Sequence, residues 1–171
     1  LRVGVAFGYG SGHLNLSGGN GRARVNYTET AITGDYTDGL FYADALLGGA
    51  WGSGHTHRDV SLPGLPAAAS GKVSDSQFMT SLEAGYTVVQ DAVDVTPFAA
   101  LNIGAVNEGG FTETGGAALD LQAAGKSVTG TQSVVGTRVT GEVPFDQLTL
   151  KIDAKLGWAH EFPAGRSVTQ S

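Results

Sequence analysis

The side chains able to form charged contacts are few in this chain, and they carry both signs. Only 15% of the 171 residues are Asp, Glu, Lys or Arg, and the formal net charge is −6. Seven charged residues stand at polar positions of segments in which apolar and polar residues alternate: Asp44, Glu83, Arg138, Lys151, Asp153, Lys155 and Glu161. Opposite charges in this pattern predict ion pairs, provided that the segments bring them to one face.

Histidines and glycine-rich motifs point to other chemistry, but each lacks a necessary part. His55 and His57 flank Thr56, and only Asp59 stands near enough in sequence to serve as a third metal ligand. The motifs "GYGSGHLN" and "GGAWGSGH" do not lie between a buried strand and a helix, which is the context of a phosphate-binding loop. We therefore expect no metal and no other cofactor.

Catalytic and nucleic-acid functions find little support. Serines are plentiful, but no segment resembles a nucleophile elbow. The absence of cysteine excludes a disulfide scaffold and a thiolate metal site, and the negative net charge argues against a nucleic-acid partner. Spacing alone does not exclude an enzyme, but we expect none.

Strands are the elements that must position the charged residues. Along 148–162, Leu148, Leu150, Ile152, Ala154, Leu156, Trp158 and Phe162 face one side, and Thr149, Lys151, Asp153, Lys155 and Glu161 face the other. A helix would place apolar side chains on two opposed faces, so the period of two predicts a strand. Similar patterns predict eight strands, at roughly 1–10, 22–36, 39–56, 72–90, 92–106, 111–123, 128–141 and 147–162.

The length of these segments separates a membrane protein from a soluble one. Ordinary strands have about five or six residues, whereas a tilted strand needs about 9–11 to cross a bilayer core. The polar faces carry mostly Gly, Ala, Ser, Thr and Asn, and the chain has 27 glycines. A soluble sandwich would instead carry many Lys and Glu residues on its outer face. The pattern favours an all-β fold, an antiparallel transmembrane up-and-down β-barrel in a single domain, 1–171, with a soluble β-sandwich binding module as the alternative.

In such a barrel the apolar rows face lipid and the polar rows face a wet lumen. The seven charged residues are then candidates for the lumen wall. Two interpretations stay open: ion pairs that hold charge in a confined interior, and a polar lining against which a translocating or plugging segment packs. Trp51, Tyr86, Trp158 and Phe162 lie near strand ends on apolar faces, as in aromatic girdles, although core packing would explain each one singly.

The connections between strands predict which end carries the long loops. Short links stand at Asp38–Gly39, "VVQDAVD" and "AAGKSV", and longer or glycine-rich links at "GSGHLNLSGGNG", "GHTHRDVSLPGLPAAASG", "NEGGF" and "GEVPFDQ". Their alternation predicts periplasmic turns at one end and extracellular loops at the other. Residues 53–71 are expected to form an exposed, mobile loop, because they show neither alternation nor helix length.

Five segments in the same order resemble the translocator β-barrel domain of bacterial autotransporters, the type V secretion family. "KLGWAHEF" is similar to the family's Leu-Gly-Trp and His-Glu-Phe strand signature, and "LRVGVAFGYG" resembles its glycine-rich early strand. "GLFYADALLGGAWGSGHTHRDV" resembles the strand that ends near an arginine, here Arg58. "TPFAALNIGAVNEGGFTETGGAALDL" resembles the Pro-Phe strand with Glu-x-Gly, here Glu113 and Gly115. "SVVGTRVTGEV" resembles the Leu-Gly-x-Arg segment, with Arg138 in the last place.

The resemblance implies a bacterial outer-membrane protein that anchors and exports an N-terminal passenger. Its implied partners are outer-membrane lipid, its own passenger and linker segment, and the barrel assembly machinery. Family barrels have about twelve strands, and this chain resembles the portion from near the third to around the tenth. The chain begins at Leu1, which we interpret as a cut N-terminus with room for a signal sequence upstream. The alternative is a stand-alone eight-stranded outer-membrane barrel with a structural or adhesive role.

Overall fold

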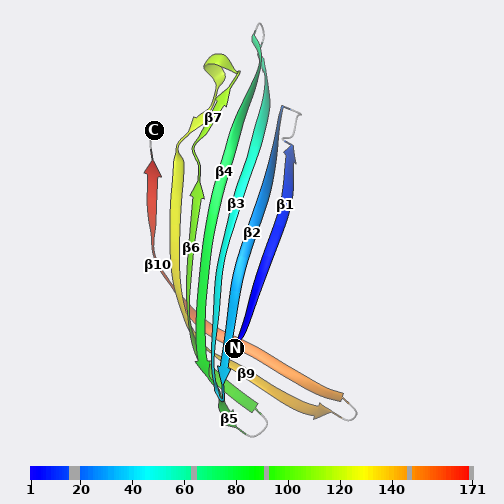
Figure 1. Cartoon of the computed structure of the whole chain (residues 1–171), viewed down its shortest axis with the longest axis vertical. Coiled ribbons are helices and arrows are strands. Elements are labelled where there is room, and N and C mark those ends of the chain that lie inside the picture. Colours follow the sequence, from blue (N-terminus) through cyan, green and yellow to red (C-terminus); the bar gives the residue numbers. More distant parts are fainter. Residues whose placement is uncertain (16–19, 63–64, 91–92, 146–147, 170–171) are drawn as a thin grey trace.

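The computed structural model describes residues 1–15, 20–62, 65–90, 93–145 and 148–169, nearly all of them in antiparallel strands (Figure 1). The strands are β1 (Arg2–Asn15), β2 (Gly21–Asp38), β3 (Phe41–Leu62), β4 (Leu65–Tyr86), β5 (Val88–Gln90), β6 (Val93–Glu108), β7 (Phe111–Thr114), β8 (Gln122–Ala123), β9 (Gly125–Phe145) and β10 (Leu148–Thr169). One short 3-10 helix, Ala117–Leu119, stands among the described residues. No helix in these ranges is long and apolar enough to cross a membrane.

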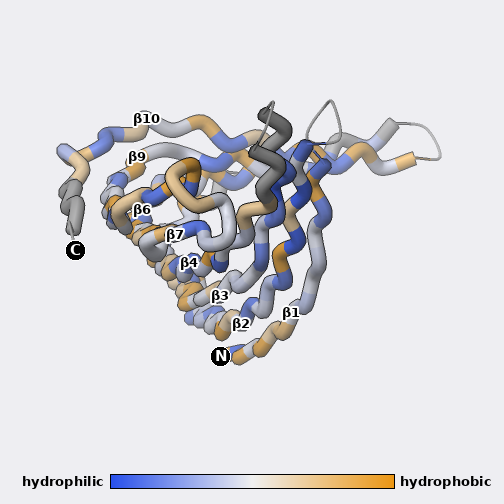
Figure 2. The backbone as a smooth tube through the Cα atoms, turned by 90° about the horizontal axis from the view of Figure 1, so that it is seen from above, coloured by the Kyte–Doolittle hydropathy of each residue, from blue (hydrophilic) through white to orange (hydrophobic). Residues whose placement is uncertain are grey.

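The long strands form one curved sheet in the order β1-β2-β3-β4-β6-β9-β10, so each pairs with the next along the chain. Figure 2 shows the sheet from above, bent around a concave side, with β1 and β10 as its two edges. The all-β, antiparallel, up-and-down prediction is confirmed. Within the described ranges the sheet is not closed, which corresponds to part of a barrel wall.

The prediction of a barrel strand over 111–123 is wrong. This segment divides into β7, the 3-10 helix and β8, and β6 pairs directly with β9. The backbone turns at Gly115, with φ of 103°, and at Ala117, with φ of 54°, and neither angle belongs to a strand. The described sheet therefore has seven long strands, one fewer than the eight predicted.

The predicted loop over 53–71 is also wrong as secondary structure, apart from residues 63–64, which lie outside the described ranges. β3 and β4 continue pairing through it, from Ser53 opposite Ser74 to Leu62 opposite Leu65. Each strand has 22 residues, about 70 Å at about 3.3 Å per residue, far beyond the thickness of a bilayer core. The ladder set by the alternating part of these strands continues beyond that part, because backbone pairing needs no apolar face.

The predicted polarity of the connections holds from the first link as far as "NEGGF" and fails for "AAGKSV" and "GEVPFDQ". Gly39 and Leu40 form the β2–β3 turn, one residue beyond the predicted Asp38–Gly39, and Gly39 has φ of 59°, which glycine adopts without strain. "AAGKSV" belongs to the β6–β9 connection, at the same end as "NEGGF". The strand predicted at 111–123 would place "GEVPFDQ" at the loop end. Without that strand, β9 ends and β10 begins at the opposite end of the sheet, where the β2–β3 turn also lies.

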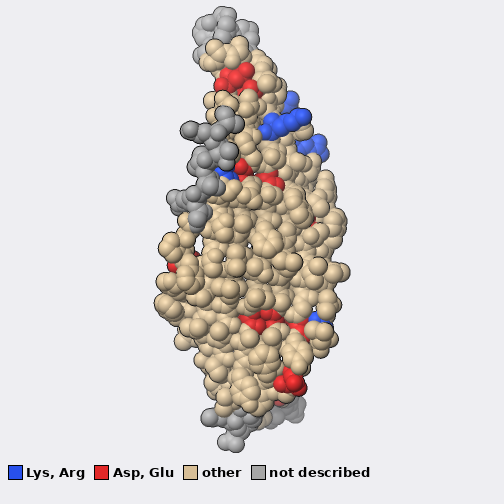
Figure 3. Space-filling view, turned by 60° about the vertical axis from the view of Figure 1, so that its left-hand side comes forward, with Lys and Arg blue, Asp and Glu red and all other residues tan. Residues whose placement is uncertain are grey.

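The two faces of the sheet differ in composition. On the convex face, large apolar side chains are exposed on every long strand, including Val5, Phe7, Ile32, Leu47, Phe78, Leu82, Leu101, Val135, Leu150, Leu156 and Trp158. In Figure 3 the middle of the molecule is almost free of Lys, Arg, Asp and Glu. The register places the small residues Gly4, Ala6, Gly8, Gly48, Gly52, Gly85 and Gly104 on the opposite, concave face.

Aromatic side chains mark both limits of this apolar belt. At the turn end, Phe41 stands opposite Tyr86, and its ring centroid is 6.4 Å from that of Tyr36. Toward the other end, Tyr9 and Trp51 flank Thr28 in one row of the sheet. Two such bands are typical of strands that cross a membrane, since aromatic rings favour its interfaces.

Candidate functional site: the concave polar face

The concave face carries an ion pair that spans four strands. Lys155 Nζ on β10 lies 2.7 Å from both carboxylate oxygens of Glu83 on β4. β6 and β9 lie between these strands, so the pair bridges three strand spacings of about 4.8 Å each. Side chains converge over such a span only on the inside of a curved sheet. The pair therefore fixes the face to which the polar positions of β4 and β10 belong.

Neighbouring strands support this pair from the same side. Tyr42 on β3 donates a hydrogen bond of 2.9 Å from its hydroxyl to Glu83, and Lys155 Nζ lies 4.1 Å from the ring centroid of Phe98 on β6. Tyr42 crosses the strand at Gly85, where a Cβ atom would collide with its ring. The small residue at position 85 thus lets an aromatic side chain lie flat across the wall.

A second ion pair completes the group. Arg138 on β9 donates from Nε to Asp153 on β10 over 2.8 Å, and its NH2 group contacts the other carboxylate oxygen. Such two-point contacts are stronger and more directional than single ones. The inner charged cluster is defined by Tyr42, Glu83, Arg138, Asp153 and Lys155, and Asp44 adjoins it as the register partner of Glu83.

A ladder of polar side chains, neutral except for Glu161 at its end, runs beside the cluster. Ser81 donates to Asn102 over 2.7 Å, Asn102 to Gln132 over 3.3 Å, and Gln132 to Glu161 over 3.4 Å. Their strands are β4, β6, β9 and β10, so this polar ladder crosses the same part of the wall as the cluster. Amide and hydroxyl groups in this arrangement present both donors and acceptors to whatever occupies the concave side.

The structure brings together four of the seven charged candidates and separates the others. Glu83, Arg138, Asp153 and Lys155 belong to the inner charged cluster, and Asp44 lies beside it. Glu161 belongs to the polar ladder. Lys151 pairs instead with Glu142 at 2.8 Å, and both side chains are more than 60% exposed. All seven candidates lie on the concave face of the sheet. That this face borders an enclosed lumen is a proposal.

A buried ion pair fastens the β6–β9 connection to the end of β3. Arg58 NH2 lies 2.5 Å from a carboxylate oxygen of Glu113 and donates to the carbonyl of Leu119 over 2.9 Å. Leu121 N–H donates to Glu113 over 3.0 Å. Glu113 is only 4% exposed, and its hydrogen bond with Arg58 lowers the pKa of its carboxyl group despite that burial. The two residues noted for their resemblance to family positions are thus direct partners.

The histidine motif forms a different contact. His57 lies 3.1 Å from Ser70 Oγ through Nδ1 and 3.2 Å from Asp59 through Nε2. In the ranges that the structure describes, no group of three His, Asp or Glu side chains is placed to hold a metal.

The arrangement of the concave face suits a hydrated polar surface, with paired charges and alternating donors and acceptors.

Sequence reasoning missed Tyr42 and the neutral ladder. Tyr42 precedes Asp44 by two positions, so the period of two places both side chains on the same face of the strand. The contact across Gly85 could not be predicted in this way, because it depends on strand register. The same holds for the Arg58–Glu113 pair, whose partners are 55 residues apart.

Comparisons with known proteins agree with this geometry. The family model described as "Autotransporter beta-domain" matches residues 1–171. Two Serratia marcescens proteins, each called "Extracellular serine protease", are 29% and 27% identical over 164 residues. The matches cover 94% and 90% of this chain but 15% and 16% of those proteins, so the chain spans about a sixth of their length.

A solved structure is also similar, the translocator domain of autotransporter NalP from Neisseria meningitidis. It shares 14% sequence identity, and the match covers 96% of this chain and 72% of that one with a TM-score of 0.45. The family assignment depends instead on the family model over the whole length. With its curved sheet, its apolar convex face and a family model that covers residues 1–171, the chain belongs to the autotransporter β-domain family of the bacterial outer membrane.

Proposed function

We propose that this chain forms part of a translocator wall that anchors an N-terminal passenger and lets it cross the outer membrane. The observation that carries the proposal is the Lys155–Glu83 pair, which turns the polar face of the sheet inward. The convex face meets lipid, and the concave face meets the linker of the passenger. The wall itself has no catalytic role.

The composition of the concave face supports passage of a polypeptide. Glycine and alanine keep the wall thin at Gly4, Ala6, Gly8, Gly48, Gly52 and Gly104, and therefore leave room inside. The charges of the inner cluster are paired, so none of these five side chains carries an unpaired charge that would hold a passing segment in place. The polar ladder offers exchangeable hydrogen bonds to an extended backbone.

The edges of the sheet support a wall that extends beyond these strands. Unpaired backbone groups in hydrocarbon cost several kcal/mol each. In the described sheet, β1 and β10 are not paired to each other. Further strands of the same protein complete the barrel, and the outer-membrane assembly machinery inserts it.

The relatives' names are consistent with export. "Extracellular" places those Serratia proteins outside the cell, while their protease activity belongs to whole proteins of which this chain matches about a sixth. For this chain we propose only that its passenger is exported, and we assign the passenger no activity.

Adjacent residues on β6 allow a matched test of the function. Ala100 lies on the concave face, opposite Glu83, and Ala99 lies on the convex face. In the full-length protein, Ala100→Trp should narrow the path and slow the arrival of the passenger at the cell surface, whereas Ala99→Trp should leave it unchanged. Protease accessibility of the passenger on intact cells measures arrival, and heat-modifiable migration on a gel confirms that each barrel has formed. Equal display for both folded variants would contradict a path along the concave face.

A further inference from the structure

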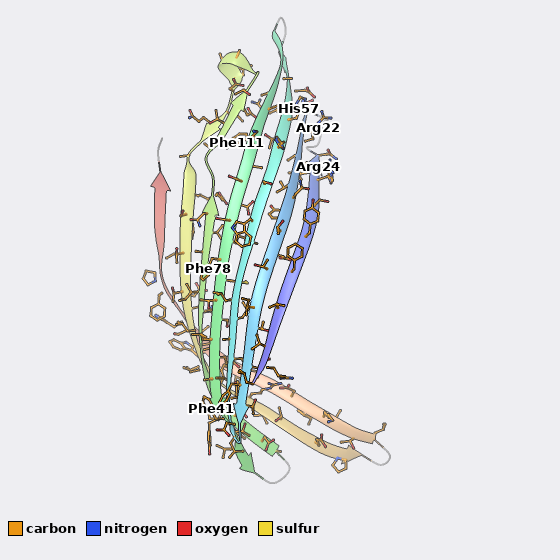
Figure 4. All side chains as sticks on the ribbon, in the orientation of Figure 1. Arg22, Arg24, Phe41, His57, Phe78 and Phe111 are labelled. Atoms are coloured by element: carbon orange, nitrogen blue, oxygen red, sulfur yellow. The ribbon has the colours of Figure 1, made fainter. Side chains whose placement is uncertain are left out.

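Four neighbouring strands each contribute a basic residue to one row of the sheet. His13 on β1 stands opposite Arg24 on β2, Arg24 opposite His55 on β3, and His55 opposite Lys72 on β4. Directly opposite residues share a face, so the four side chains lie side by side. Arg22 precedes Arg24 by two positions on the same strand face, and Figure 4 shows both arginines at the end of the sheet where His57 also lies. The basic patch is defined by His13, Arg22, Arg24, His55 and Lys72.

The basic patch lies on the convex face, just beyond the apolar belt. Tyr9 and Trp51 belong to the aromatic band at the end of the belt away from the β2–β3 turn. His13 follows Tyr9, and His55 follows Trp51, by four positions on the same strand face. This spacing is about 13 Å along a strand at about 3.3 Å per residue. Figure 3 shows Lys and Arg side chains gathered toward this end, with the nearly uncharged belt beside them. The patch is therefore at the depth of lipid head groups when the belt is in the membrane.

The cations of the patch differ from the other cations whose side chains the structure describes in having no carboxylate partner. Arg2, Arg58, Lys126, Arg138, Lys151 and Lys155 all form ion pairs. Across the described ranges, no ion pair within 4.0 Å involves Arg22, Arg24 or Lys72, and all three are exposed. The neighbouring carboxylate of Asp59 lies 3.2 Å from Nε2 of His57. A chain of net charge −6 thus keeps a cationic row on its lipid-facing side.

We propose that the basic patch binds phosphate groups of lipid heads, while the acyl chains of the same lipids cover Tyr9 and Trp51. The inference depends on the proposed function in one respect, that the convex face meets the membrane. Arginine forms two-point contacts with phosphate, lysine adds a point charge, and the histidines add hydrogen-bond donors. Residues on adjacent strands lie about 4.8 Å apart, so the row offers several donors to one phosphorylated head.

Binding of a phosphorylated glycolipid to the purified full-length protein tests the proposal. Lipid A, its dephosphorylated form and inorganic phosphate are titrated separately against the protein in neutral detergent, and native mass spectrometry measures the bound fraction. Arg24→Gln and Lys72→Gln remove one charge each from the patch. Lys126→Gln is the matched control, since Lys126 lies near the same end but pairs with Glu108 at 3.0 Å on the concave face.

The expected result is tighter binding of lipid A than of its dephosphorylated form, weakened about fivefold by each patch variant and unchanged in Lys126→Gln. Equal affinity for the two lipids, or equal losses in all three variants, would overturn the lipid site. Inorganic phosphate that binds as tightly as lipid A would also overturn it, and would indicate a site for free anions. Heat-modifiable migration and passenger display are measured on the same variants, so a failure of the barrel or of export is seen separately.

Discussion

At the scale of single residues, the contact between Glu83 and Lys155 holds distant strands of the wall in one curvature. The two side chains are 22% and 45% exposed, so water screens the pair less than it screens the pair of Glu142 and Lys151, which is 62% and 78% exposed. Tyr42 and Phe98 contact the first pair and account for part of its lower exposure. The energetic weight of a pair on this wall should follow its burial.

A double-mutant cycle measures that difference. Replacing Glu83 and Lys155 by Gln, singly and together, should give a coupling free energy of about 0.5–1 kcal/mol or more in folding titrations of the full-length barrel into vesicles. The same cycle on Glu142 and Lys151 should give a clearly smaller coupling, because water screens this exposed pair. A coupling that is no larger for the inner pair would mean that it does not constrain the sheet.

The buried pair of Arg58 and Glu113 predicts a local response to acid. The pKa of Glu113 is lowered from the ordinary value of 4.5, so the contact contributes its full stability above that value and loses it as pH falls through the lowered pKa. Amide hydrogen exchange at Leu121, whose N–H donates to Glu113, should therefore speed up in strong acid, beyond the intrinsic change. In Glu113→Gln, exchange should be fast already at neutral pH and show no added acid step. An acid step that persists in this variant would assign the transition to another group.

Individual side chains were partly predictable. The alternating pattern placed the polar candidates on one side of each strand, because the period of two fixes the face of every residue once one is known. It did not predict that Lys155 meets Glu83 rather than Glu142. That choice depends on the curvature of the sheet, which brings β10 toward β4.

At the scale of elements, the belt on β3 predicts opposite tolerances for adjacent leucines. Leu47 is 49% exposed on the convex face, between Phe41 and Trp51, and Leu46 lies on the concave face. Leu47→Arg should destabilise the barrel by about 2–4 kcal/mol, since it brings a charge to the middle of the bilayer. Leu46→Arg should cost clearly less, because the concave side is wet. Folding titrations into vesicles measure both, and equal penalties would contradict the assignment of the faces.

The elements themselves divide into those that the pattern predicts and those that it does not. Long alternating strands such as β6, predicted at 92–106 and observed at Val93–Glu108, were found closely, because one face is uniformly apolar. The extension of β3 and β4 was missed, because beyond the belt no apolar face remains to mark a strand. The break at 111–123 was missed because Gly115 and Gly116 interrupt a segment whose composition still alternates.

At the scale of the whole molecule, the two open edges predict that residues 1–171 do not form a stable barrel alone. Expressed without further strands, they should aggregate or fail to show heat-modifiable migration, whereas the full-length protein should show it. The physical reason is the cost of unpaired backbone groups in lipid. A stable, heat-modifiable monomer of these residues would favour a small stand-alone barrel closed by these strands instead.

The measurement that most directly tests the account is cross-linking of the passenger linker to each face of the wall during export. The chain has no native cysteine, so single cysteines at Ser81 and Gln132 probe the concave face without background from this region. Thr80 and Ser133, their neighbours on the convex face, are the matched controls. The account predicts cross-links from Ser81→Cys and Gln132→Cys in the full-length protein, and none from Thr80→Cys or Ser133→Cys. Cross-links from the convex positions alone, or from both faces equally, would contradict it.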